Sequence, residues 1–563
     1  MTTFAPKPFI AVMKRLSALC LYIICVSAAF AALPPREVRA VWLTTLSGLD
    51  WPRRAATTPE GFARQRQSLC QTLDSLRAAG INTVLFQTRI RATSAYASPF
   101  EPWDGVFTGT PGLAPDYDPL ALAVDECHRR GMELHAWVVA FPLGRDAALR
   151  RLGRSALTRR RPELCRRAGD QWYMDPGLPG VAEYLGALCA DIARRYDVDG
   201  IHLDYIRYPE RGIPFDDRTT YRRHGHGQPR DRWRREAVTR CVRAVHDSVR
   251  RIKPWVRLSC SPVGKHADLA RYSSRGWNAR DAVYQDAQAW LRAGWMDLLF
   301  PMMYFTGDHF YPFAADWQEQ SAGRPVVPGL GIYFLSPAER DWPLRTVERQ
   351  MRFVRRLGMG QAYFRSRFLT ADTKGLYRFM ADEFYARPAL TPAMTWVDSI
   401  APPAPAVRVE RLGHSLRLSW PAVADNAPGG VAYCVYALTG GEWRPLSLRQ
   451  SATSYAYAPA LPARLTVPLA VTALDRYGNE SRPAIVGLGD EAVPTPACVV
   501  ADSLPLPPLD AEFVLLTDVA GRPVMTVRPT RSLAVGALAP GFYSVRTLDA
   551  RGRSHRVSAF VKR

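Results

Sequence analysis

The sequence predicts an α/β chain in which a (β/α)8 barrel is followed by all-β sandwich modules, and three observations support this class. Apolar strand-like runs alternate with longer helical patterns between residues 36 and 385. Near residue 400 the pattern changes to short β-rich runs separated by proline-rich breaks. Hydrophobic residues make up 47% and charged residues 22% of the 563 positions, close to globular averages, which excludes a disordered or fibrous chain.

Each unit of the predicted barrel joins one apolar run to one helical stretch. The eight strand-like runs are Glu37–Thr45, Asn82–Ile90, Glu133–Phe141, Gly200–Tyr208, Arg257–Val263, Asp297–Phe305, Val326–Phe334 and Gly360–Phe368. The helical stretches between them include Pro59–Ala79, Pro119–Arg130, Val181–Arg195, Arg232–Ile252, Asp281–Ala293 and Arg345–Leu357. Eight such units are the number in a TIM barrel. A doubly wound sheet is the alternative, but it rarely has eight evenly spaced units.

The N-terminus predicts export. Lys14 and Arg15 are followed by an apolar run, Leu16–Phe30, which is too short to span a bilayer, and Ala29-Phe30-Ala31 has the small-x-small form of a cleavage site. Residues 1–31 are therefore predicted to be a signal peptide. No later stretch offers enough uninterrupted apolar residues for a transmembrane segment, so none is expected after its removal.

The charge balance is strongly basic. Lysine and arginine number 74 against 52 acidic residues, a net charge of +22, and the basic residues are scattered along the chain. Proteins that bind nucleic acid usually gather their basic residues in a patch or tail, and this chain does not, so no nucleic-acid partner is expected. An anionic glycan or a bacterial surface fits the charge better, and a coding bias toward arginine is the alternative. The cysteines have neither CxxC nor zinc spacing, so we predict no disulfide framework and no metal.

The region after residue 400 is predicted to hold two small modules. Residues 401–405 read Ala-Pro-Pro-Ala-Pro, a stiff linker. Short β-rich runs over 401–490, with a tryptophan on an early strand and tyrosines on later ones, favour a β-sandwich. After a second proline-rich break, residues 511–563 again contain short strands.

The fourth barrel strand carries the strongest chemical signal. Asp204 lies near the end of an otherwise apolar run, where TIM barrels place their chemistry. Strand alternation puts His202 on the same face, one layer below, where it could hold Asp204. Partly desolvated in a barrel mouth, Asp204 would be poised as nucleophile or general acid/base. The alternative is a structural aspartate paired with Arg207 or a neighbouring arginine.

Other strand ends offer aromatic and hydrogen-bonding groups, which together suit a sugar ring. We predict that these groups bind substrate, although an aromatic residue taken alone more often belongs to the core than to a sugar-binding surface. They are Trp42, Gln87, Arg89, Trp137, Tyr304 and Tyr333.

A second carboxylate is needed if Asp204 cleaves glycosidic bonds. The leading candidate is Glu101, in the loop after strand two, which two flanking prolines stiffen. A salt bridge at the rim of the barrel is its alternative role. Asp175, in the loop after strand three, could contribute to the site or simply cap the next helix. Asp216 and Asp217 are the fallback candidates.

Residues 36–385 resemble the bacterial glycosyl-hydrolase-like family ten, a TIM-barrel family of exported proteins. The matching stretches, in order along the barrel, are Glu37–Thr45, Asn82–Gln87, Ser98–Trp103, Tyr117–Leu120, Glu133–Trp137, Met174–Gly177, Asp199–Asp204, Lys253–Val256 and Ser261–Gly264. This resemblance implies cleavage of a glycosidic bond. The chain departs from the expected pattern beside Asp204, where Tyr205 supplies an aromatic ring rather than a second acid.

The C-terminal modules carry two further resemblances. Residues 401–490 resemble a fibronectin type III module. The tail is similar to the C-terminal sorting domain of the type IX secretion system, through Val514–Val524, Leu538–Val545 and Phe560–Arg563. The second resemblance implies outer-membrane secretion machinery as a partner. An ordinary β-sandwich module is the alternative for the tail.

These observations predict an exported glycoside hydrolase that acts on a polysaccharide or a peptidoglycan-like glycan with two carboxylates and no cofactor. The expected location is the cell surface or the extracellular space, with the periplasm as the alternative. A barrel that binds carbohydrate or cell envelope without catalysis is the second hypothesis.

Overall fold

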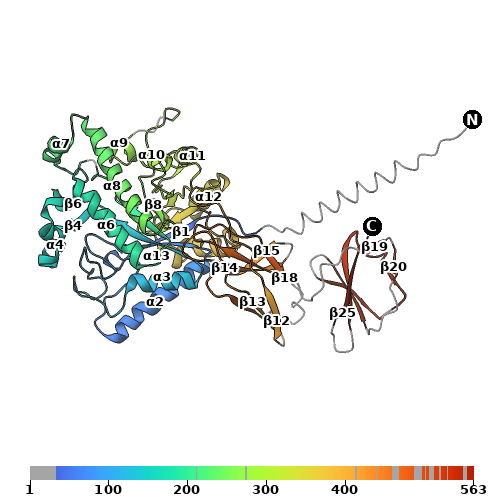
Figure 1. Cartoon of the computed structure of the whole chain (residues 1–563). Helices are drawn as coiled ribbons and strands as arrows, with labels where there is room; N and C mark the ends of the chain where they lie inside the picture. The colour runs from blue at the N-terminus through green and yellow to red at the C-terminus, as the bar shows by residue number, and fades with distance from the viewer. Residues whose placement is uncertain are drawn as a thin grey trace, which may run out of the picture.

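The computed structural model of the chain describes residues 33–562 apart from short gaps, and its course is drawn in Figure 1. The gaps are residues 211, 273–275, 413–414, 440–441, 459–467, 487–497, 501, 506–512, 519–521, 529 and 549–553. The predicted signal peptide, residues 1–31, lies outside the described part. Within that part, no helix combines the length and the apolar character needed to cross a membrane.

The N-terminal domain is built on eight parallel strands. They are β1 (Arg39–Leu43), β2 (Thr83–Arg89), β3 (Glu133–Val139), β7 (Gly200–Asp204), β8 (Arg257–Cys260), β9 (Leu298–Leu299), β10 (Gly329–Leu330) and β11 (Gln361–Tyr363). Their order in the sheet is β10-β11-β1-β2-β3-β7-β8-β9. Val327 N donates to Leu299 O and Gly329 N to Pro301 O, both at 2.8 Å, so β9 also meets β10. The predicted (β/α)8 class is confirmed.

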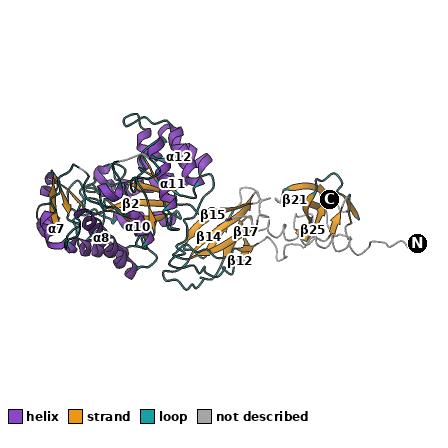
Figure 2. Cartoon of the chain, turned by 90° about the horizontal axis from the view of Figure 1, so that it is seen from above, coloured by secondary structure: helices purple, strands orange, loops and turns teal. Residues whose placement is uncertain are grey.

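Helices surround these strands, and Figure 2 shows them confined to the barrel part of the chain. The longer ones are α2 (Pro59–Ala78), α3 (Pro119–Arg129), α6 (Pro179–Arg195), α8 (Arg230–Ile252) and α12 (Leu344–Arg356). Proline at the first turn and a capping side chain start two of them: Thr58 accepts from Gly61 N, and Asp118 from Leu120 N.

One stretch that was predicted as a single helix forms two shorter helices in the structure. The stretch Asp281–Ala293 is divided into α9 (Ala279–Ala282) and α10 (Ala287–Arg292). Tyr284 between them has a φ of 64°, in the left-handed region, which interrupts a right-handed helix. The apolar periodicity continues across the break and so does not reveal it.

Two apolar layers follow from strand alternation. Side chains on one face of each strand fill the barrel interior, among them Trp42, Leu85, Trp137 and Phe300. Side chains on the other face pack against the helices in a larger core. Parallel strands buried on both faces explain why the runs in the sequence are apolar throughout.

A small sheet that the sequence did not predict follows strand β3. It contains β4 (Pro142–Arg145), β5 (Cys165–Ala168) and β6 (Gln171–Met174) in the antiparallel order β4-β6-β5. The helix α4 (Asp146–Leu152) lies between β4 and β5 in the chain. These strands are only four residues long, and β5 has two arginines at its centre, so the segment does not show the apolar pattern of a strand.

The C-terminal part is all-β. The strands β12 (Arg408–Leu412), β13 (Ser415–Ser419) and β16 (Ser454–Tyr457) form one antiparallel sheet, and β14 (Ala432–Thr439), β15 (Glu442–Gln450), β17 (Leu469–Leu474) and β18 (Ala484–Val486) form another. One apolar cluster takes residues from both sheets, including Leu418 and Val435. We refer to this pair of sheets as the sandwich. Its assignment to the fibronectin type III modules stays a prediction.

The last module contains further strands. A five-stranded sheet has the order β19-β25-β24-β21-β22, from β19 (Cys498–Val500), β21 (Phe513–Asp518), β22 (Pro523–Val527), β24 (Gly541–Leu548) and β25 (Ser554–Lys562). A shorter pair joins β20 (Ser503–Pro505) to β23 (Ser532–Ala534). Its assignment as a sorting domain also stays a prediction.

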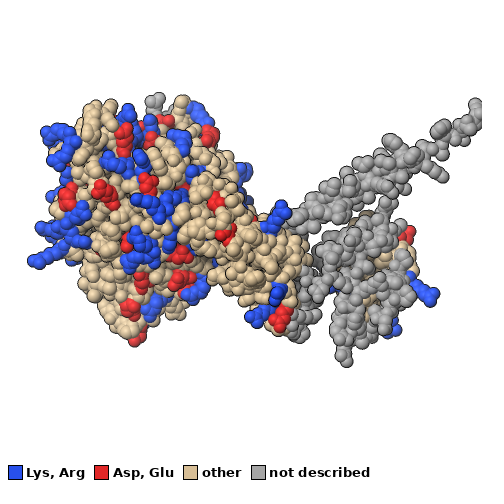
Figure 3. Space-filling model, viewed as in Figure 1, with Lys and Arg blue, Asp and Glu red and all other residues tan. Residues whose placement is uncertain are grey.

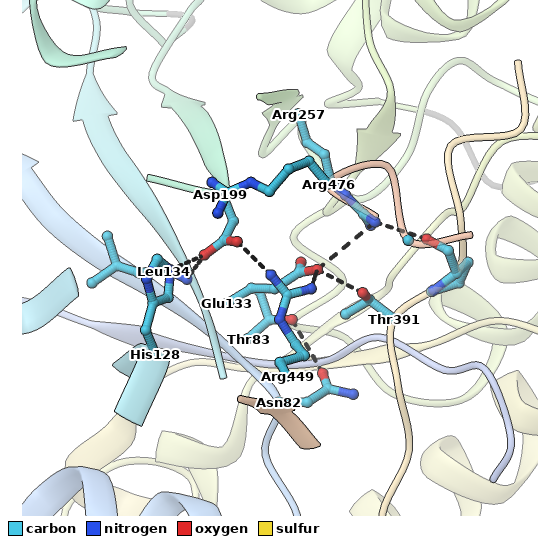
Figure 4. A network of polar contacts seen from close by, with 12 residues as sticks. Asn82, Thr83, His128, Glu133, Leu134, Asp199, Arg257, Thr391, Arg449 and Arg476 are labelled. Atoms are coloured by element: carbon cyan, nitrogen blue, oxygen red, sulfur yellow. Dashed lines mark hydrogen bonds and ion pairs between the residues drawn. The ribbon is translucent and has the colours of Figure 1, made fainter. Parts of the chain in front are cut away.

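The sandwich contacts the end of the barrel at which the parallel strands begin. Arg449 on β15 donates to Glu133 at 3.0 Å and to Asp199 at 2.7 Å, two carboxylates at the N-terminal ends of β3 and β7 (Figure 4). At Gly131 a Cβ would lie 2.4 Å from the carbonyl oxygen of Leu448, so only glycine fits there. The sandwich therefore sits at the opposite end of the barrel from Asp204.

Candidate active site

Asp204 is the last residue of β7, at the C-terminal end of the barrel. Its side chain is 5% exposed and accepts three hydrogen bonds. Ser261 Oγ donates to Oδ1 at 2.7 Å, the backbone N–H of Tyr205 donates to Oδ1 at 2.8 Å, and Trp137 Nε1 donates to Oδ2 at 3.1 Å. Trp137 is on β3 and Ser261 directly follows β8, so both neighbouring strands hold the carboxylate.

Burial and hydrogen bonding act on Asp204 in opposite directions. Burial raises the pKa of its carboxyl group, because the charged form is disfavoured away from water. The hydrogen bond from Ser261 and the charge of Arg207 partly oppose that rise. The net shift is upward, so Asp204 keeps its proton to a higher pH than an ordinary aspartate does.

The chain changes direction immediately after Asp204. Tyr205 has a φ of 50°, in the left-handed region, so β7 ends at Asp204 and the predicted strand to Tyr208 is too long. The Tyr205 side chain is 38% exposed, whereas Arg207 is 4% exposed. The guanidinium carbon of Arg207 lies 4.6 Å from the ring centroid of Tyr205 and 5.7 Å from that of Trp277.

Aromatic side chains gather beside Asp204, as the sequence predicted for Tyr304 and Tyr333. Their ring centroids are 5.8 Å apart, and Tyr304 lies 5.5 Å from Phe364. The negative charge of Asp204 contributes to raising the pKa of Tyr304, which places the two side chains close together. Both tyrosines remain partly accessible, so their rings could contact a bound sugar.

Trp42 and His202 lie one layer deeper, inside the barrel. Trp42 Nε1 donates to His202 Nε2 at 3.2 Å, and His202 Nδ1 contacts Ser259 Oγ at 3.0 Å. Burial lowers the pKa of His202 well below its ordinary value, so the ring is neutral. Their exposed fractions are 1% and 0%, which leaves no surface for the predicted contact with substrate. Ser261 and Trp137, rather than His202, donate hydrogen bonds to Asp204.

Gln87 has a structural role in place of the predicted contact with substrate. Its side-chain Oε1 accepts from Thr44 Oγ1 at 2.6 Å, from Thr45 N at 2.9 Å and from Leu46 N at 2.8 Å. Gln87 is 3% exposed. It therefore fixes the loop after β1 and offers the substrate no free carbonyl oxygen.

Arg89 and Glu101, both assigned to the site from the sequence, are instead bound to each other. Arg89 donates to the two oxygens of Glu101 at 2.8 and 2.6 Å, and Tyr184 on α6 donates to Glu101 at 3.1 Å. The Glu101 side chain is 1% exposed. No hydrogen bond or ion pair among the described residues joins Glu101 to Asp204. This geometry argues against Glu101 as the second carboxylate. The prediction failed because Glu101 is paired with a buried arginine, and the position of Glu101 in a loop does not reveal that partner.

The other acids considered from the sequence are also engaged. Asp175 is fully buried and accepts from Thr220 Oγ1 at 2.6 Å and from Gly177 N at 3.0 Å. It does not cap α6, whose N-cap residue is Leu178 and has no side-chain hydrogen bond. Asp217 is buried between Arg230 and Arg234. Asp216 is exposed and paired with Arg218 at 2.9 Å.

Arg207, whose charge acts on Asp204, and Trp277, whose ring lies beside Arg207, were not assigned to the site from the sequence. Trp277, in the loop after β8, is 40% exposed. Arg207 has a buried Nε without a hydrogen-bond partner among the described residues. Trp277 could have been assigned to the site from the sequence, because it follows a predicted barrel strand and so lies in a βα loop. Within the described part of the chain no group of three His, Cys, Asp or Glu side chains could hold a metal ion.

The fold and this site define a TIM-barrel protein with a carboxylate and aromatic rings at its mouth. The family model described as Glycosyl hydrolase-like 10 matches residues 37–328. Glycosyl hydrolase DigH of Escherichia coli (strain K12) is 33% identical over 336 residues, which cover 54% of this chain and 76% of that protein. The chain therefore belongs to the Glycosyl hydrolase-like 10 family.

A second relative aligns beyond the family match. Glycosyl hydrolase YngK of Bacillus subtilis (strain 168) is 27% identical over 478 residues, covering 79% of this chain and 92% of that protein. The solved glycoside hydrolase domain of PgaB (BpsB) from Bordetella bronchiseptica is more remote. It has 15% identity and a TM-score of 0.40, and covers 62% of this chain and 98% of that domain.

Proposed function

We propose that the protein is an exported glycoside hydrolase that cleaves glycosidic bonds in a polysaccharide or a cell-envelope glycan. The observation that carries this proposal is Asp204: a nearly buried carboxylate at the C-terminal mouth, oriented by Ser261 and Trp137 and flanked by tyrosine rings. Membership of a glycosyl hydrolase-like family supports the same reaction type.

The chemistry requires two carboxyl groups on either side of the scissile bond. One gives a proton to the departing sugar oxygen, and the other attacks the anomeric carbon or takes a proton from the water that does. Asp204 can fill one of these roles, since its two oxygens are fixed by hydrogen bonds and its pKa is raised. Tyr304 and Tyr333 would support the sugar ring. This reaction needs no cofactor.

A barrel that binds glycan without cleaving it is the second candidate. The observation that favours it is the burial of Glu101 against Arg89, which removes the acid that the sequence had placed opposite Asp204. The aromatic mouth would then act as a binding surface only.

Export and surface location belong to the proposal as well. Residues 1–31 have the composition of a signal peptide, and residues 511–563 resemble a type IX sorting domain. The partners would be a polysaccharide or peptidoglycan-like glycan and the outer-membrane secretion machinery. The cell surface or the medium would be the destination, with the periplasm as the alternative.

The test is a screen of the purified full-length protein against peptidoglycan and against anionic and neutral polysaccharides. Release of new reducing ends by the wild-type protein, and none by Asp204→Asn, is the expected result. Retention of a polysaccharide by both proteins without cleavage would favour the binding-only barrel.

A further inference from the structure

The described carboxylates at this end of the barrel differ in how many partners they have. Asp50, which follows β1, has a 2% exposed side chain and is held by Arg365 at 2.5 Å and by the backbone N–H groups of Thr44 and Arg367. Glu101, Asp175 and Asp217 are similarly buried with two or more donors each. These acids could not reach a substrate without breaking their own pairs.

Glu210 differs from these four acids. Its side chain is 53% exposed, and its one hydrogen-bonded side-chain partner within the described residues is Arg207, at 3.4 Å. A contact of that length to an exposed carboxylate is a weak one. Glu210 is therefore free to turn toward a bound sugar.

Glu210 is also linked to Asp204 through shared neighbours. It belongs to the segment that leaves β7, six positions after Asp204. Its negative charge, like that of Asp204, contributes to raising the pKa of the Tyr205 hydroxyl. The Arg207 guanidinium packs over the Tyr205 ring, binds Glu210 and acts on the Asp204 carboxylate. Both acids therefore share Tyr205 and Arg207 as neighbours.

We propose that Glu210, beside Arg207, is the second carboxylate of the site and acts as the ionised partner of Asp204. This inference rests on the proposed function. The two environments suit different roles, because Asp204 is buried among aromatic rings and Glu210 is hydrated and beside a cation.

The resulting reaction balances. Asp204 transfers its proton to the glycosidic oxygen as the bond from that oxygen to the anomeric carbon breaks. Glu210 assists the incoming water or attacks the anomeric carbon itself. When water has added its oxygen to that carbon, its spare proton returns to the carboxylate pair, and both acids are restored.

The experiment compares Glu210→Gln, Glu210→Asp and Asp204→Asn in the full-length protein. The substrates are the polysaccharide cleaved in the screen above and a dinitrophenyl glycoside of the sugar that it releases. Glu236→Gln is the matched control, because Glu236 is 46% exposed and paired with Arg232 at 2.9 Å on the outside of the barrel. Each variant is also assayed with added sodium azide.

We expect Glu210→Gln to lose about 10²-fold or more in turnover on both substrates, with no change in thermal midpoint. Azide should restore part of its activity and yield a glycosyl azide, since azide can replace the missing nucleophile or base. Glu210→Asp should keep more activity than Glu210→Gln. Asp204→Asn should instead retain activity on the dinitrophenyl glycoside, whose leaving group needs no protonation.

Wild-type turnover in Glu210→Gln, equal to that of Glu236→Gln, would overturn the inference and leave the proposed function standing. Loss of activity in Glu210→Gln without azide rescue, but with rescue by the activated leaving group, would also overturn the assigned role. Absence of cleavage by the wild-type protein in the screen would remove the proposed function, and the inference with it.

Discussion

Asp204 has three hydrogen-bond donors from three segments of the chain, and each contributes to its behaviour. Ser261 and Tyr205 N–H meet Oδ1, while Trp137 alone meets Oδ2. Two residues that define this environment are 57 and 67 positions away from Asp204 in the sequence. Substitutions here therefore separate chemistry from packing.

Asp204→Asn should lower turnover by about 10²-fold or more, because an amide has neither the charge nor the transferable proton. The new NH2 group would face the Trp137 N–H, and this clash of donors should cost about 1–3 kcal/mol in the free energy of unfolding. Steady-state kinetics and urea unfolding measure the two effects. A destabilised variant with normal turnover of the folded protein would make Asp204 a packing residue.

Ser261→Ala should move the Asp204 limb of the pH–rate profile to higher pH. The Ser261 hydrogen bond lowers the pKa of Asp204, so its loss adds to the rise caused by burial. If Asp204 is the general acid, the alkaline limb of kcat/KM shifts upward; if it is the nucleophile, the acid limb shifts upward. A limb that stays in place, or moves to lower pH, would contradict this assignment.

The raised pKa of Asp204 also determines how its contribution to stability changes with pH. The pKa of Asp204 is higher in the folded state than in the unfolded chain. The folded state is therefore favoured with Asp204 protonated, below its unfolded pKa, and this contribution is lost as the pH rises through the folded value.

At the scale of secondary-structure elements, the Arg89–Glu101 pair joins three of them. Arg89 at the end of β2 donates to Glu101 and to the carbonyl oxygen of Ala140, after β3, at 2.8 Å. Tyr184 on α6 completes the cluster. Its side chains are almost fully buried, so removing one charge leaves the other without a partner.

Glu101→Gln should lower the free energy of unfolding by about 3–5 kcal/mol, the range for breaking a buried ion pair. Turnover of the protein that remains folded should be unchanged. Urea unfolding and active-site titration provide the two readouts, with Glu236→Gln as an exposed control expected to lose about 1 kcal/mol or less. A stable, inactive Glu101→Gln protein would return Glu101 to the chemistry.

At the scale of the whole molecule, the sandwich completes the N-terminal end of the barrel. Arg449 is the cation that Glu133 and Asp199 share, and Thr391 donates to Glu133 at 2.6 Å (Figure 4). A second ion pair, Arg476 with Asp197 at 2.5 Å, lies at the same joint. The sandwich therefore supplies a cation to two buried carboxylates of the barrel, in addition to Arg257 and His128 of the barrel itself.

Arg449→Met should lower the free energy of unfolding by about 3 kcal/mol or more, because two nearly buried carboxylates lose a cation.

Arg449 contributes to lowering the pKa of Glu133 and of Asp199. Their contribution to stability is present above the unfolded carboxyl pKa and lost as the pH falls through the folded one. Without Arg449 both folded values rise, so acid unfolding should begin at higher pH. Urea titrations from about pH 7 down to about pH 2 measure this, since the pKa of Glu133 is lowered to about 2. An unchanged acid midpoint would mean that Arg257 and His128 suffice.

Deletion of residues 511–563 should leave glycosidase activity intact and retain the protein in the periplasm. This follows from the resemblance of the tail to a sorting domain, which is a signal for transport and takes no part in the barrel. Cell fractionation and an activity assay on each fraction measure the outcome. Normal delivery of the truncated protein to the surface would make the tail an ordinary accessory module.

The face of the molecule drawn in Figure 3 carries charges of both signs. On the face drawn in Figure 3, the blue Lys and Arg side chains are interspersed with red Asp and Glu side chains. Many of the arginines in the described part form ion pairs such as Arg130 with Asp74 and Arg271 with Glu319. The excess of arginine is thus partly used within the protein.

The sequence by itself determined the barrel, because the period of apolar residues depends on neighbours along the chain. The same pattern located the strands, so Asp204 could be placed toward the mouth, although β7 ends four residues earlier than predicted. Trp42 and His202 were placed on the correct face, but depth inside the barrel is set by packing across strands.

Only the tertiary structure decided which polar groups pair with one another. The partner of Glu101 is a buried arginine beneath α6, and the partner of Asp199 is Arg449, 250 positions away. Such pairs form wherever folding brings opposite charges together out of water, and the periodicity of apolar residues does not predict them. The course of the chain after Asp204, which leaves Glu210 exposed beside Arg207, depended in the same way on one left-handed residue, Tyr205.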